Sequence, residues 1–163
     1  MKKLLFVFLF ITSILADNIK TNYFIGAEGG VIKYTSNTSK ENIFGLKIGG
    51  YFYDKNIYKI SNRLYITIDK SEYRNTNNII ANLNLDWIWT QIPYIKPFIG
   101  ISAGYLYEST YPTSLYGFNS GIIIYIGDIV ELEFGGKINR PLENNDIYTD
   151  NFKQLYGSIN FSF

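Results

Sequence analysis

The sequence predicts an all-β protein, an eight-stranded antiparallel up-and-down transmembrane β-barrel, and three observations lead to this prediction. Apolar and polar residues alternate with a period of two in eight segments, each about ten residues long, as expected of strands with one apolar and one polar face. Aromatic residues make up 18% of the chain, and 14 glycines are spread along it. The chain ends in one of the alternating segments, from Gln154 to Phe163, and its last residue is aromatic.

The first 16 residues have the form of a secretory signal peptide. Two lysines follow Met1, and an apolar run then extends to Ala16. A helix that spans a membrane needs about 20 apolar residues, whereas this run stops before Asp17. We therefore expect residues 1–16 to be a signal peptide that is cleaved after Ala16, and residues 17–163 to form one barrel domain without a transmembrane helix.

The first four strands are predicted at residues 23–34, 43–53, 58–69 and 79–90. In the first, positions 23 to 31 alternate between apolar or small residues and a face that holds Glu28. In the second, apolar residues at 44, 46, 48 and 52 lie on the face opposite to Lys47. In the third, apolar residues at 64, 66 and 68 oppose Arg63 and Asp69. The fourth has an unbroken apolar face from 79 to 89, and Asp86 lies on its polar face.

The last four strands are predicted at residues 98–108, 115–126, 130–138 and 154–163. The fifth sets apolar residues at 99 to 107 against glycine and serine, and the sixth sets those at 116 to 126 against Asn119 and glycines. The seventh has Glu131, Glu133 and Lys137 on its polar face. The eighth alternates to the end of the chain, so that Phe163 belongs to its apolar face.

The predicted connections alternate in length. Residues 35–42, 70–78, 109–114 and 139–151 are the longer and more polar ones, and residues 54–57, 91–96 and 127–129 are the shorter ones. Long loops on one rim and short turns on the other are typical of transmembrane barrels. Since Ile126 and Val130 must share a face, we expect a three-residue loop or a bulge between them, because a two-residue turn would reverse the faces of the seventh strand.

Eight strands also form soluble barrels that carry a small ligand in an apolar lumen, so alternation alone does not identify the outer face. Here the polar face mixes charges with many glycines, as a narrow lumen requires. Aromatic residues of the apolar face lie mainly near strand ends and aliphatic residues near strand centres, which predicts the aromatic girdles of a membrane barrel. The predicted girdle comprises Phe44, Phe52, Trp87, Trp89, Tyr105, Tyr107, Tyr116, Phe118, Phe161 and Phe163.

If the polar face lines the lumen, its charged side chains have little room and must pair with one another. We expect a structural network made of Glu28, Lys47, Arg63, Asp69, Asp86, Glu131, Glu133 and Lys137. In a symmetric first hairpin, Glu28 and Lys47 are opposite or nearly so, which predicts a cross-strand ion pair.

The sequence offers no catalytic, cofactor or metal site. It contains no His and no Cys, so it lacks the residue most often used in general acid-base catalysis and has no thiolate. Glu131 and Glu133 lie two apart on one face, but with Lys137 beside them a structural role is favoured over catalysis. The net charge of +1 gives no basic surplus for nucleic acid. We expect a protein that is not an enzyme and has no cofactor.

The stretch from Lys96 to Tyr105 and the terminal strand from Leu155 to Phe163, together with the signal peptide, resemble those of the small bacterial outer-membrane β-barrel superfamily. This group includes the membrane domain of outer-membrane protein A and the opacity-type surface proteins. The resemblance implies a location in the outer membrane of a Gram-negative bacterium and contact with its lipid. It also implies delivery by the barrel assembly machinery through the C-terminal strand that ends in Phe163.

The sequence leaves two functions open. The first is a non-enzymatic structural or surface-interaction barrel that meets an unknown partner through its extracellular loops. The second is a small barrel that binds an apolar ligand or forms a narrow, porin-like pore. The loop residues with side chains suited to a partner are Tyr73, Arg74, Tyr111, Pro112, Glu143, Asp146, Tyr148 and Asp150.

Overall fold

The computed structural model describes residues 19–35, 40–54, 60–73, 76–108, 111–142 and 151–163. The predicted signal peptide, residues 1–16, lies outside the described residues. Among the described residues, no helix is long and apolar enough to cross a membrane.

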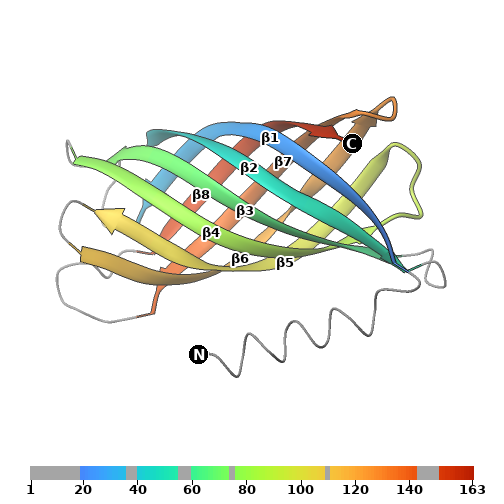
Figure 1. Cartoon of the computed structure of the whole chain (residues 1–163). Helices are drawn as coiled ribbons and strands as arrows, with labels where there is room; N and C mark the ends of the chain where they lie inside the picture. Colours follow the sequence, from blue (N-terminus) through green and yellow to red (C-terminus); the bar gives the residue numbers. More distant parts are fainter. Residues whose placement is uncertain (1–18, 36–39, 55–59, 74–75, 109–110, 143–150) are drawn as a thin grey trace, which may run out of the picture.

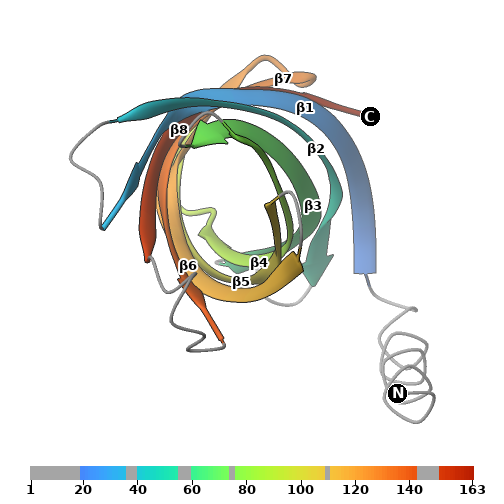
Figure 2. The same cartoon turned by 90° about the vertical axis from the view of Figure 1, so that its left-hand side faces the viewer.

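Eight antiparallel strands close into a single barrel, which confirms the predicted fold class (Figures 1 and 2). Each strand pairs with the next along the chain, and β8 pairs with β1 to complete the ring. The strands are β1 (Ile19–Tyr34), β2 (Glu41–Asp54), β3 (Ile60–Tyr73), β4 (Thr76–Trp89), β5 (Ile95–Glu108), β6 (Tyr111–Ile126), β7 (Val130–Pro141) and β8 (Phe152–Ser162).

The two ends of the barrel are named here by their connections. The loop rim carries the β1–β2, β3–β4, β5–β6 and β7–β8 connections, and the turn rim carries the other three. β1 starts and β8 ends at the turn rim, the right-hand end in Figure 1. The shortest strand has 11 residues, enough for a tilted strand to span the hydrocarbon core of a bilayer.

Two of the predicted long loops are wrong. β3 continues to Tyr73 and β4 starts at Thr76, and these two residues pair with each other. In the same way, β5 ends at Glu108 and β6 starts at Tyr111, and these two residues are also paired. The prediction of a loop at residues 70–78 relied on polar residues such as Ser71 and Asn78, which are paired strand residues buried inside the barrel. In a barrel with a polar interior, polarity does not distinguish a loop from an inward-facing strand position.

The β6–β7 connection confirms the expected three-residue loop. Ile126 pairs with Val130, and residues 127–129 form the turn. Gly127 has a φ of 68°, a backbone conformation that residues other than glycine seldom adopt. The turn therefore keeps the apolar face of β7 continuous with that of β6.

The barrel is apolar outside and polar inside. Large apolar side chains such as Leu46, Ile68, Ile101, Phe134 and Ile159 are exposed on its outer surface. Charged residues of the same strands, such as Lys47, Asp69 and Glu133, are buried in the interior. This distribution is the reverse of that in a water-soluble protein.

Candidate functional site

The interior of the barrel is layered along its axis, with apolar side chains at each end and ion pairs between them. Near the turn rim, buried side chains pack into a turn-end cluster of Phe24, Tyr51, Tyr65, Ile88, Phe98 and Ile123. Near the loop rim, a loop-end cluster contains Ile32, Tyr34, Ile43, Ile80, Leu106, Leu115 and Phe152. In chain order, Glu28 of β1, Lys47 of β2 and Asp86 of β4 each lie between a residue of one cluster and a residue of the other.

Neither cluster was predicted from the sequence. The signal was present, because apolar residues interrupt the polar face near the ends of several strands, as Ile80 and Ile88 do in β4. The prediction assumes a polar face that is uniform along each strand. Which residues meet across the lumen depends on strand tilt and stagger, which the sequence pattern does not state.

Arg63 of β3 links the turn-end cluster to the carboxylates. Its Nε donates to Asp86 Oδ2 over 3.0 Å, and its Nη1 donates to Glu133 Oε2 over 2.7 Å. Its guanidinium carbon is 4.6 Å from the ring centre of Tyr65 and 5.0 Å from that of Phe98. A planar cation with a fork of donors suits such a site, where carboxylates and aromatic faces are available at once.

Glu133 of β7 accepts hydrogen bonds from four side chains of the interior. Besides Arg63, it accepts a hydrogen bond from Lys47 Nζ at 3.2 Å and one from the hydroxyl of Tyr156 at 2.7 Å. Asn160 donates to the same carboxylate over 3.3 Å. The donors come from β2, β3 and β8, so Glu133 joins strands from opposite sides of the barrel.

The predicted pair of Glu28 and Lys47 lies in the loop-rim half of the network. Lys47 Nζ is 3.1 Å from Glu28 Oε2, although Lys47 pairs with Gly26 in the ladder, so the contact is diagonal rather than directly opposite. Lys137 Nζ donates to Glu28 Oε1 over 2.7 Å and is 3.8 Å from Asp69. Glu28 thus lies between two lysines.

All eight residues of the predicted lumen network are buried inside the barrel. Ion pairs join Glu28, Lys47, Arg63, Asp69, Asp86, Glu133 and Lys137 into one set. Glu131 lies apart from this set near the turn rim, where it accepts hydrogen bonds from the hydroxyls of Tyr51 at 2.5 Å and Ser162 at 2.6 Å.

The carboxylates of the network are occupied by donors of the protein itself. In the described part of the chain, no group of three or more His, Cys, Asp or Glu residues is placed to hold a metal ion. The carboxylates of Glu133 and Asp86 are engaged by Arg63 and by amide or hydroxyl donors. A carboxylate held by this many donors is a poor proton acceptor for a substrate and a good link between strands.

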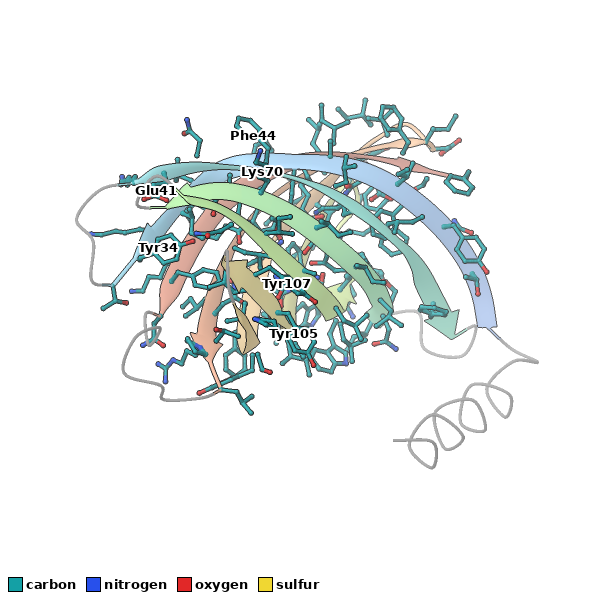
Figure 3. All side chains as sticks on the ribbon, turned by 60° about the vertical axis from the view of Figure 1, so that its left-hand side comes forward. Tyr34, Glu41, Phe44, Lys70, Tyr105 and Tyr107 are labelled. Atoms are coloured by element: carbon teal, nitrogen blue, oxygen red, sulfur yellow. The ribbon has the colours of Figure 1, made fainter. Side chains whose placement is uncertain are left out.

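The predicted girdle residues all point outward. Phe44, Tyr105, Tyr107 and Tyr116 lie toward the loop rim, and Phe52, Trp87, Trp89, Phe161 and Phe163 lie toward the turn rim. Figure 3 shows Tyr105 and Tyr107 on β5, and Phe44 of β2 beside Lys70 of β3. Phe118 differs from the others because β6 extends four residues further than predicted, which places this ring at mid-strand opposite Ile101.

A closed eight-stranded antiparallel barrel with an apolar outer surface and a buried charged interior defines the class of small membrane-spanning β-barrels. Comparison with solved structures agrees. The chain is similar to Neisserial surface protein A, with 17% identity, 86% of this chain and 97% of that chain covered, and a TM-score of 0.61. It is also similar to the N-terminal barrel domain of Pseudomonas aeruginosa OprF, with 11% identity, 86% and 97% covered, and a TM-score of 0.61.

A third similar structure is Ail, the attachment invasion locus protein of Yersinia pestis, which was solved in complex with the heparin analogue sucrose octasulfate. The identity is 9%, the coverage is 90% of this chain and 99% of that chain, and the TM-score is 0.52. Similarities at these identities establish the fold of the small outer-membrane barrels. No family model matches the chain, and no curated protein matches it.

Proposed function

We propose that the protein is a non-enzymatic β-barrel of a Gram-negative outer membrane, with a structural or surface-interaction role and a closed lumen. The observation that carries this proposal is the combination of an apolar outer surface with a paired, buried charge network. In water, the exposed apolar surface would be a large unfavourable patch, whereas in a bilayer it contacts lipid chains.

The interior favours a closed barrel rather than a pore or a carrier of an apolar ligand. Hydrated ions would have to pass both the turn-end and the loop-end cluster, and apolar constrictions of this kind exclude water. An apolar ligand would have to displace the ion pairs of Arg63 or Lys47 and leave charges buried without partners, which is costly.

A role at the cell surface places the interaction at the loop rim. Its longest connection runs between Pro141 and Phe152. Of the candidate loop residues, Arg74, Glu143, Asp146, Tyr148 and Asp150 lie outside the described residues, whereas Pro112 is an exposed residue of β6. Two proteins of this fold carry names that describe a surface protein and an attachment protein, which supports a surface role.

The proposed partner in assembly is the barrel assembly machinery, which would recognise β8 and its terminal ring. Phe163 lies at the closing seam: its backbone N–H donates to the Tyr23 carbonyl over 2.9 Å, and the Tyr23 N–H donates to the Phe163 carbonyl over 3.0 Å. β8 is therefore both the last strand of the chain and the one that closes the barrel.

Cell fractionation and gel mobility test the proposed location. We expect the protein in the outer-membrane fraction, and we expect unheated samples to migrate differently from boiled ones because a closed barrel resists detergent unfolding. Release into the soluble periplasmic fraction by osmotic shock would contradict the membrane assignment. A change of mobility without membrane association would support a soluble barrel instead.

A further inference from the structure

A groove of about 680 Å³ crosses the outer surface of the barrel. It starts at β1 and runs over β8, β7, β6 and β5 to β4. Its outward-facing lining is aliphatic and aromatic along most of its course and ends in lysines near the loop rim. The apolar walls of the groove contain Val31, Leu155, Ile138, Phe118, Ile101 and Trp87. Its basic end contains Lys33, Lys40 and Lys153.

Small residues form the floor of the groove. Ser120 of β6 and Gly136 of β7 face outward and pair with each other, and Gly136 also pairs with Leu155 of β8. Their larger neighbours Phe118 and Ile138 form a second pair beside them. The difference in side-chain size between these adjacent pairs produces a furrow on a surface that is otherwise covered by large apolar groups.

The basic end of the groove contains an unfavourable pair of like charges. Lys33 of β1 and Lys153 of β8 are directly opposite each other in the ladder, both exposed, and Lys40 joins them in lining the groove. Like charges directly opposite on one face destabilise a sheet. Within the described residues none of these three lysines has an ion pair, so an external anion would relieve the repulsion.

The charge on the outer wall is one-sided. Among strand residues whose side chains the structure describes, the charged ones that are exposed are all basic and all near the loop rim: Lys33, Lys70, Arg140 and Lys153. The outer wall toward the turn rim is apolar, with Ile126, Trp87 and Phe161 exposed. The groove therefore joins a cationic end to an apolar course along the same surface.

We propose that this groove binds a lipid with an anionic phosphate headgroup, that is, one with a net negative charge. The phosphate bridges the ammonium groups of Lys33 and Lys153, with Lys40 beside them, and an acyl chain lies over Gly136 and Ser120 between the apolar walls. Charge complementarity selects a lipid with a net negative headgroup over a zwitterionic one, and the apolar course selects a lipid over a soluble phosphate. The inference rests on the proposed membrane location, since only there does lipid reach this surface.

Lipid retention by the purified full-length barrel tests this site. The barrel is placed in nanodiscs of phosphatidylcholine that contain phosphatidic acid as the probe, and the bound lipids are counted by native mass spectrometry. We expect the unaltered protein to retain phosphatidic acid in preference to phosphatidylcholine. The double substitution Lys33→Gln and Lys153→Gln should weaken this retention on the order of 30-fold at low ionic strength, since each surface cation contributes about fivefold.

The matched control removes two other cations of the same rim. Lys70→Gln with Arg140→Gln changes the net charge equally, but neither residue lines the groove. We expect this variant to retain phosphatidic acid as the unaltered protein does. An equal loss in both variants would mean diffuse attraction to the rim and would overturn the site, as would equal retention of phosphatidylcholine or displacement of the lipid by inorganic phosphate.

A second pair of variants tests the apolar course. A Cβ at Gly136 would meet its nearest neighbours at 3.5 Å, and one at Gly157 would also meet its nearest neighbour at 3.5 Å, so both positions accept a side chain. Gly136→Val fills the groove and should reduce phosphatidic acid retention, whereas Gly157→Val, outside the groove, should not. The proposal would be overturned if Gly136→Val retained phosphatidic acid as well as the unaltered protein does. It would also be overturned if a second copy of the chain covered the groove.

The gel mobility shift of every variant reports folding separately. Failure of the unaltered protein to retain phosphatidic acid, although it is folded and inserted in the membrane, contradicts the groove and leaves the proposed barrel function intact. Failure of the unaltered protein to enter membranes contradicts the proposed function itself.

Discussion

Glu133 is the residue whose loss should disturb the interior most. Glu133→Gln removes the charge that Arg63 and Lys47 share and leaves both cations buried with fewer partners. We expect the free energy of unfolding to fall by about 3 to 5 kcal/mol, the usual cost of breaking a buried ion pair on one side. Urea titration of the folded barrel in detergent, followed by tryptophan fluorescence, measures this change.

The control for this prediction is Glu131→Gln on the same strand and face. Glu131 accepts hydrogen bonds from two hydroxyl groups and lies outside the ion-paired set, so its neutral amide should be tolerated better. Equal losses of unfolding free energy in the two variants would show that the ion pairs of Arg63 and Lys47 with Glu133 do not add to the stability of the barrel.

At the residue scale, the sequence predicted local contacts and missed distant ones. The pair of Glu28 and Lys47 follows from the symmetry of one hairpin, and the structure contains it at 3.1 Å. The contact of Arg63 with Glu133 joins β3 to β7 across the lumen and depends on the tilt of every strand between them. No single hairpin contains that information.

At the scale of the element, β5 offers a direct test of the lipid-facing side. Ile101 is exposed near the centre of the strand, so Ile101→Arg should cost about 2 to 4 kcal/mol in folding stability if this face meets lipid at mid-depth. Tyr107→Arg on the same face near the loop rim should cost only about 0 to 1 kcal/mol, because the penalty falls toward the interface. Both values are measured by denaturant unfolding in lipid vesicles. Similar costs at the two positions would argue against a depth-dependent lipid environment.

Alternation predicted the faces of all eight strands correctly, because a period of two is set by backbone geometry and not by the environment. Strand ends were predicted less well. β3, β4, β6 and β7 each extend three or more residues further toward the loop rim than expected, and the added residues include the buried polar Ser71 and Asn78. The polarity that usually ends a strand in a soluble protein has no such meaning on the lumen side of this barrel.

At the scale of the whole molecule, the layered interior predicts that the barrel does not conduct ions. Because apolar clusters close both ends, purified protein inserted in planar lipid bilayers should show no steady conductance, whereas a wide porin in the same bilayers gives open-channel steps. Steady current steps from this protein, at a salt concentration that leaves its gel mobility shift intact, would contradict a closed lumen.

The number of strands and the closure of the barrel were predictable, since eight alternating segments leave no other way to pair every edge in a membrane. The two apolar clusters of the interior were not predictable, because each is made of side chains from six strands. Such a property belongs to the closed ring and to no one segment of the sequence.

The seam between β1 and β8 also constrains the order of events during folding. Phe24 of β1 pairs with Ser162 of β8, so the ring cannot close before Ser162 has been synthesised. Until then, a growing sheet has two unpaired edges, each able to associate with another chain. Contacts of such high sequence separation form slowly. We therefore expect the unclosed sheet to aggregate more readily than the closed ring until β8 pairs with β1.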